Sequence, residues 1–244
     1  LNNAKVGGVL ILDTSSAYGN AEEILGDVKA GESFKIVSKY PKCDNTVAET
    51  FNNSLKVLGI DCLYGYLLHH FEAYRENKPV WNYFVQLQKE GKVDRIGFSL
   101  YEPWELDQIL KDGIPFSLIQ VPYNIFDRQF EPYFKQLKEM GVEIHVRSTF
   151  LQGLFFKDRE TLPEKLQPLK KYLIQLDEYA ASKGISVGDL ALNYNLYNPY
   201  IDGVLIGVDN KEQLLQNFAS VKDIEINLDI KVEELELLKP VNWQ

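Results

Sequence analysis

The feature that most constrains this chain is a regular alternation of short apolar runs with longer amphipathic stretches. Seven short runs are apolar and β-branched, and most are nearly continuous in apolar character, as expected for parallel strands with both faces covered. They occupy residues 9–12, 34–38, 63–69, 95–99, 117–121, 142–146 and 203–206.

The stretches between these runs are predicted helices. Apolar residues recur at helical spacing over residues 46–58, 80–90, 130–140 and 210–218. Gly59, Gly91 and Gly141 follow three of these stretches, where a left-handed helix cap is expected. Residues 162–183 are predicted to form a long helical insert, and the first residues of the chain resemble the end of a helix.

Regular β-α alternation leaves two α/β architectures, an open doubly wound sheet or a closed eight-stranded barrel. We predict a TIM-type (β/α)8 barrel that lacks its first strand in this sequence. We also expect one domain over residues 1–244, with further residues before Leu1, because the chain does not begin with Met.

The composition excludes several classes of protein. The 244 residues carry a formal net charge of -9, which opposes a nucleic-acid footprint or an anionic membrane surface as partner. The two cysteines, Cys43 and Cys62, fit a reducing compartment. No apolar run approaches the roughly 20 residues that span a bilayer. We expect a cytoplasmic protein.

Polar side chains stand where the predicted strands end. Asp13, Lys39, His69, Ser99 and Gln120 follow this pattern on the first five strands. In a barrel these positions converge at the carboxyl-terminal mouth, where barrel active sites are assembled. The barrel therefore predicts one site, whereas an open sheet would string these residues along an edge.

The chemistry of these residues is coherent together with Tyr18. A tyrosine hydroxyl has an ordinary pKa of about 10, and a nearby cation such as Lys39 lowers the pKa of such a group. Asp13 can hold Lys39 in its charged form, and His69 can direct a neutral N–H at a carbonyl oxygen. This combination predicts a general acid that supports addition to a carbonyl.

Other interpretations of the same residues exist. A lone Asp or Lys at a strand end is usually a turn or solvated residue. His69 and His70 suggest a metal, but neighbouring residues on a strand point to opposite faces, so a shared ion is disfavoured. We expect His70 on a loop or rim and His145 partly buried. A metal-dependent hydrolase barrel is disfavoured because no set of three or four ligands is apparent.

Ordered motifs add a resemblance to a known family. The segment from Asp13 to Gly26 resembles the Asp-Thr-Ala-x-x-Tyr-Gly-x-x-Glu-x-x-Leu-Gly signature of aldo-keto reductases. Val-Ser-Lys at 37–39, Tyr-Leu-Leu-His at 66–69, Ile-Gly-Phe-Ser at 96–99 and Gln-Val-Pro-Tyr-Asn at 120–124 resemble later motifs of that family in the same order. Residues 146–153 also resemble members encoded with surface-polysaccharide genes.

The resemblance implies a monomeric barrel that binds NADPH and passes hydride to a small or sugar-like aldehyde or ketone. Tyr18 would be the general acid, with Asp13 and Lys39 tuning it and His69 orienting the substrate. The implied cofactor-binding residues are Ser99, Gln120, Arg147, Ser148, Gly207, Asp209, Gln213, Gln216 and Asn217.

The chain departs from the family pattern in its cofactor half. Leu100 replaces the usual Asn, and Arg147 replaces an aromatic residue beside the nicotinamide. Asp209 would repel a 2′-phosphate, although Lys211 could offset it, so NAD is an alternative to NADP. The family's N-terminal hairpin and first strand are absent here. These departures keep open a cofactor-binding regulatory or scaffold protein with little turnover.

Overall fold

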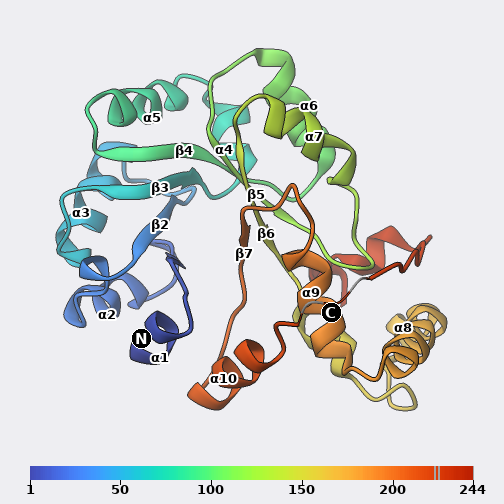
Figure 1. The fold of residues 1–244 in the computed structure, drawn as a ribbon. Coiled ribbons are helices and arrows are strands. Elements are labelled where there is room, and N and C mark those ends of the chain that lie inside the picture. The colour runs from blue at the N-terminus through green and yellow to red at the C-terminus, as the bar shows by residue number, and fades with distance from the viewer. Residues whose placement is uncertain (223, 225, 244) are drawn as a thin grey trace. The chain divides into compact units, whose positions relative to one another are not determined.

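The computed structural model describes residues 1–222, 224 and 226–243 (Figure 1). The chain divides into two compact units. Unit 1 comprises Leu1–Val121 and Leu137–Ile144, and unit 2 comprises Pro122–Gln136 and His145–Gln244. The expected single domain over residues 1–244 stays a prediction.

The sheet has the strand order β1-β2-β3-β4-β5-β6-β7, which is also the order along the chain. Unit 1 contributes β1 (Ile11–Asp13), β2 (Lys35–Tyr40), β3 (Leu63–Leu68), β4 (Val93–Ser99) and most of β5 (Leu118–Pro122), all paired in parallel. In unit 2 the end of β6 (Glu143–Arg147) pairs in parallel with β7 (Gly203–Val204). The predicted seven parallel strands of an α/β barrel fold are confirmed, each end lying within about two residues of its predicted position.

One helix precedes the strands of unit 1 and others connect them. They are α1 (Asn2–Val6), α2 (Ala21–Asp27), α3 (Val47–Leu58), α4 (Phe71–Glu76), α5 (Val80–Lys89) and α6 (Pro103–Asp112), with a 3₁₀ turn at Ala30–Glu32. The left-handed cap predicted at Gly59 is confirmed for α3. The structure adds a capping box between Thr46 and Glu49 at the start of this helix.

The helices of unit 2 include the predicted insert. It forms a 3₁₀ segment, Glu164–Leu169, followed by α8 (Lys170–Lys183), and the break coincides with Pro168 inside the first segment. The remaining elements are α7 (Glu131–Glu139, shared with unit 1), α9 (Val187–Leu196), α10 (Lys211–Ala219) and 3₁₀ turns at Leu151–Phe156, Leu235–Leu238 and Pro240–Trp243.

Four helices were not predicted: α2, α4, α6 and α9. Helices α2 and α4 have 7 and 6 residues, so few apolar positions repeat within each. Helix α9 is apolar on several faces, burying Leu190, Ala191, Leu192 and two asparagines, so its helical period is weak. Capping boxes at Glu102 and Ser186 were the available signals for α6 and α9.

Each unit has its own apolar core. In unit 1, Val37 of β2, Leu67 of β3 and Leu118 of β5 are fully buried, with Ile11 and Tyr64 packed against them. In unit 2 the core extends from the 3₁₀ turn after β6 through α8 and α9. Throughout the described residues, no helix combines the length and apolar character needed to cross a bilayer.

Helix α2 packs very closely on α3. A Cβ at Gly26 would meet the backbone oxygen of Val57 at 1.9 Å, so only glycine fits there. Because the loop 14–20 joins β1 to α2, this close packing fixes the far end of the segment that carries Tyr18.

Candidate active site

The five polar residues predicted from the sequence lie at or near the carboxyl ends of the first five strands. Asp13 and Ser99 are the last residues of β1 and β4, while Lys39 lies one residue before the end of β2. His69 directly follows β3, and Gln120 lies on β5, in register with Ser99. The structure therefore places all five at the carboxyl ends of adjacent parallel strands, where barrel sites form.

The centre of the cluster is an ion pair between a buried lysine and a half-buried aspartate. Lys39 is fully buried, and its Nζ lies 2.5 Å from Oδ1 of Asp13. The same nitrogen donates to the backbone oxygen of Thr14 at 2.9 Å. Asp13 also accepts a hydrogen bond from Nε2 of Gln120 at 2.8 Å. Both charges are thus paired and hydrogen-bonded, which a buried charge requires.

Tyr18 lies over this ion pair. The Lys39 ammonium is 5.1 Å from the centre of the Tyr18 ring, within the range of a cation–π contact. The Tyr18 hydroxyl lies 3.5 Å from Nε2 of His69, and the two rings meet edge to face at 5.5 Å. Tyr18 is 47% exposed, whereas Lys39 is buried, so the ring of a partly exposed tyrosine lies beside a cation that solvent does not reach.

His69 has a second contact that the sequence did not predict. Its Nδ1 lies 3.1 Å from Oγ of Ser15, a residue that is 1% exposed. The expectation that His69 and His70 point to opposite faces is wrong, because the two rings stack at 4.6 Å with planes 15° apart. Strand alternation does not apply here, since β3 ends at Leu68. His70 stacks in turn on Tyr101 at 6.1 Å.

His70 and His145 differ in their burial, and neither belongs to a cluster of metal ligands among the described residues. His70 is half-buried at the start of α4, consistent with the expected rim position. His145 is 1% exposed, more deeply buried than expected, and lies so close to β7 that a Cβ at Gly203 would meet its ring at 2.7 Å. Across the part of the chain that the structure describes, no three His, Cys, Asp or Glu side chains gather in a way that could hold a metal.

The two residues of unit 1 that were predicted to hold the nicotinamide are both buried, and one of them is hydrogen-bonded to the ion pair. Ser99 and Gln120 are each 2% exposed, and the Gln120 amide donates to Asp13. Gln120 therefore belongs to the ion-pair network in this structure. Leu100, which replaces the usual Asn, is fully buried and donates its backbone N–H to the Gln120 carbonyl.

The remaining predicted cofactor residues belong to unit 2. Asp209 and Gln213 contact each other at the start of α10, where the Asp209 N–H donates to Gln213 Oε1 at 2.8 Å and Gln213 Nε2 donates to Asp209 Oδ2 at 3.3 Å. No residue of α10 is buried, and Gln216 and Asn217 lie on its last turn. Gly207 is exposed on the segment before α10.

Arg147 and Ser148 lie at the end of β6. Both are half-buried, and the Arg147 guanidinium lies 3.5 Å from Oγ of Ser148. Ser148 adopts a left-handed backbone conformation with φ 67°, which is unusual for a residue other than glycine. The Asn124 amide donates to its carbonyl at 3.0 Å and supports this turn within unit 2.

A buried carboxylate that the sequence patterns did not single out lies between α2, β2 and α3. Glu22 is 5% exposed and accepts the hydroxyls of Ser38 at 2.5 Å and Ser54 at 2.9 Å. It thereby connects α2 to β2 and α3. The signal was available, because Glu22 stands at the glutamate of the signature quoted above.

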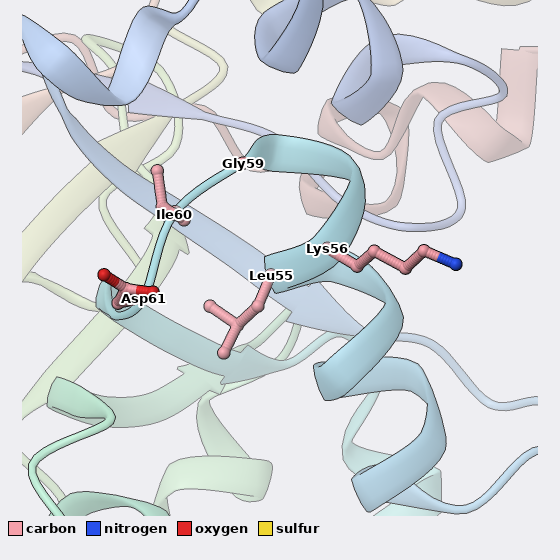
Figure 2. Close-up of a pocket in the computed structure, with 5 residues that line it drawn as sticks. All are labelled: Leu55, Lys56, Gly59, Ile60 and Asp61. Carbon is pink, nitrogen blue, oxygen red and sulfur yellow. The ribbon is translucent and has the colours of Figure 1, made fainter.

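The surface of unit 1 is hollowed in at least two places. The larger, of about 380 Å³, is lined by Leu55, Lys56, Gly59, Ile60 and Asp61 (Figure 2). It lies at the end of α3, before β3 begins, and therefore at the amino ends of the strands. The smaller, of about 220 Å³, includes Ser16 and Pro41 and lies beside the loops that follow β1 and β2. Only the smaller hollow is on the side of the polar cluster.

Comparison with known sequences decides the family. The sequence profile of the Aldo/keto reductase family matches residues 1–232. The chain belongs to the aldo-keto reductase family. It is accordingly an NAD(P)H-dependent oxidoreductase that acts on carbonyl compounds. An uncharacterized oxidoreductase of Bacillus subtilis is 25% identical over 246 residues, covering 94% of this chain and 79% of that protein.

Solved structures agree with the fold of this aldo-keto reductase. The holo form of an aldo-keto reductase from Bacillus halodurans matches with a TM-score of 0.77 at 22% identity, covering 96% of this chain and 87% of that one. An aldo-keto reductase from Klebsiella pneumoniae in complex with NADP and acetate matches with a TM-score of 0.70 at 22% identity, covering 98% and 82%. At this level of identity the likeness concerns the fold.

Proposed function

We propose that this aldo-keto reductase uses NADPH to reduce a small or sugar-like aldehyde or ketone, with Tyr18 as the general acid. The observation that carries the proposal is the geometry around Tyr18. Its ring lies 5.1 Å from a buried ammonium, and its hydroxyl lies 3.5 Å from an imidazole nitrogen. A tyrosine needs a cation nearby to release a proton at neutral pH.

In the proposed reaction each residue has a distinct task. The bound nicotinamide supplies the hydride that is added to the carbonyl carbon. Tyr18 gives its proton to the carbonyl oxygen as negative charge develops there, so the product is a neutral alcohol. Lys39 stabilises the tyrosinate that remains, and Asp13 holds Lys39 in place and charged. His69 directs the carbonyl oxygen toward the Tyr18 hydroxyl.

The chemistry of the predicted cofactor residues, taken in each unit by itself, supports binding of a dinucleotide. Ser99 supplies a buried hydroxyl for the carboxamide, and Gln216 and Asn217 supply amides on a helix that buries none of its residues. The Klebsiella relative was crystallised with NADP. Asp209, however, carries a negative charge at the start of α10, which favours a ribose hydroxyl over a phosphate. NADH is therefore the competing cofactor.

The decisive experiment is Tyr18→Phe. We expect kcat for aldehyde reduction to fall at least about a hundredfold, because one positioned general acid contributes on that order. Cofactor binding, followed by quenching of tryptophan fluorescence, should survive. Tyr83→Phe is the matched control, since Tyr83 is an exposed tyrosine on α5. Undiminished turnover by Tyr18→Phe would remove Tyr18 from its assigned role.

Leu100 motivates a second candidate, a cofactor-binding regulatory or scaffold protein with little turnover. The residue is fully buried and replaces a side chain that would hold the carboxamide. Titration with NADH and NADPH, followed by a panel of aldehydes, separates the two candidates. Tight binding without oxidation of the cofactor would favour the scaffold.

A further inference from the structure

A buried serine near the proposed acid contacts the His69 ring. Ser15 lies in the turn after β1, and its Oγ is 3.1 Å from Nδ1 of His69. The same oxygen accepts the backbone N–H of Ala17 at 3.2 Å. The aldo-keto reductase signature has alanine where Ser15 stands, so this contact comes from the chain's own sequence.

The hydrogen-bond partners of Ser15 indicate which nitrogen of His69 carries the proton. Within the described residues, Oγ of Ser15 has the Ala17 N–H and the His69 ring as its hydrogen-bond partners. Ser15 is 1% exposed, and a buried hydroxyl proton without an acceptor is costly. The Ala17 N–H is itself a donor, so the Ser15 proton goes to Nδ1 of His69. A neutral imidazole carries one proton, which is then on Nε2.

The position of that proton matters because Nε2 lies 3.5 Å from the Tyr18 hydroxyl. As an N–H donor, Nε2 cannot accept the Tyr18 proton, so this proton stays available for a carbonyl oxygen. In the opposite tautomer Nε2 would accept the Tyr18 hydroxyl and turn the acid away from the substrate. The Nε2–H tautomer also provides a second donor to the same carbonyl oxygen.

We infer that Ser15 is a positioning residue, which fixes His69 as the Nε2–H tautomer and so keeps the Tyr18 proton for the substrate. The inference rests on the proposed function for its consequence in catalysis. The tautomer itself depends only on the contacts of Ser15 and His69. The two can therefore be measured separately.

The first test is nitrogen NMR of the full chain labelled with ¹⁵N-histidine, at a pH near 8 where free imidazole is neutral. The sequence has three histidines, and His70→Gln and His145→Asn assign the signals. We expect His69 to be the Nε2–H tautomer, and Ser15→Ala to populate the other tautomer. Ser16→Ala is the matched control, because its hydroxyl donates to the Lys39 carbonyl instead and should leave His69 unchanged. A wild-type Nδ1–H tautomer, or no change in Ser15→Ala, would overturn the inference.

The second test is turnover of glyceraldehyde with NADPH. Ser15→Ala should lower kcat about tenfold, the upper range for one neutral hydrogen bond, while the Kd for NADPH stays unchanged. Ser15→Thr keeps a hydroxyl and should recover most of the rate. Equal rates in wild type and Ser15→Ala would refute the catalytic consequence. If no aldehyde is reduced by the wild type, the proposed function fails, and the NMR result still decides the role of Ser15.

Discussion

The proposed proton-delivery residues of unit 1 and the proposed adenine-side residues of unit 2 differ in how firmly the protein holds them. Lys39 is fully buried and bonded to Asp13 and to a backbone carbonyl. Helix α10, in contrast, buries none of its residues, and Asp209 is exposed. The first region depends on a fixed buried network, so single changes there should be severe. The second depends on exposed charge, so single changes there should tune binding.

The largest expected effect is that of Lys39→Met, a substitution of similar length that removes the charge. Asp13 would keep a carboxylate that has lost its ion-pair partner, at a cost of about 3 kcal/mol in the free energy of unfolding. Aldehyde reduction should fall at least about a hundredfold as well, because Tyr18 loses its neighbouring cation. Chemical denaturation and steady-state kinetics measure the two losses.

The double variant Asp13→Asn with Lys39→Met separates these losses. Removing both charges leaves no unpaired ion, so most of the stability should return. The rate should not recover, since the cation beside Tyr18 is still missing. If the rate recovered together with stability, Lys39 would have a structural role alone.

The second-largest expected effect is that of Gln120→Met, which tests whether Gln120 supports Asp13 or binds the nicotinamide. Its amide donates to Asp13 in unit 1, although the family resemblance assigns it to the nicotinamide. Gln120→Met should lower kcat about tenfold through the lost hydrogen bond to Asp13, and leave the Kd for NADPH nearly unchanged. Gln108→Met is the control, because Gln108 makes an equivalent bond to Asp112 on α6 at 2.9 Å. A raised Kd with unchanged kcat would assign Gln120 to the cofactor instead.

A smaller effect is expected at the start of α10. Asp209→Ser should shift the ratio of the NADH and NADPH dissociation constants toward NADPH by about fivefold, a modest change because exposed charges are screened. Glu212→Gln removes the same charge one turn away and should shift the ratio less. Binding titrations at low and physiological salt check both. An unchanged ratio would show that Asp209 does not face the phosphate.

The sequence was sufficient for the strands and for the residues at their ends, because both follow from short-range periodicity and chain order. The sequence was insufficient to predict contacts between residues far apart in the chain, or side-chain directions beyond the end of a strand. Gln120 and Asp13 are 107 positions apart, so no local pattern predicts their bond. The stacking of His69 on His70 depends on β3 ending at Leu68, and strand ends are the least certain part of such predictions.

The bond from Ser15 to His69 illustrates a further limit. Ser15 is a small polar residue in a turn, where serine usually needs no special explanation. Its importance depends on a ring 54 positions away and on its own near-complete burial. Only the folded chain reveals these two facts together.

The smallest expected effect concerns the anchor of the exposed helix. After α10, the Lys222 ammonium donates to Asp189 of α9 at 2.6 Å, and the Ser220 carbonyl accepts from Asn193 at 2.7 Å. Burial alone would raise the pKa of Asp189, but hydrogen bonds from Lys222, Ser220 and Ser186 outweigh it and lower the pKa. The carboxylate is therefore more favourable in the folded state than in the unfolded one.

This lowered pKa fixes the pH dependence of Asp189→Asn. A group whose pKa is lower in the folded state stabilises the protein above its unfolded pKa of about 3.9, and loses this contribution as the pH falls through the folded value. At pH 7 the variant should melt about 3 °C below the wild type, and the difference should shrink below pH 4. Glu160→Gln, which breaks an ion pair to Lys170 at a position 79% exposed, should melt like the wild type. A gap for Asp189→Asn that stayed constant down to pH 3 would mean that its charge is not what anchors α10. The Lys39 network and the α10 region would then differ in how deeply their side chains are buried, and not in how charge holds them.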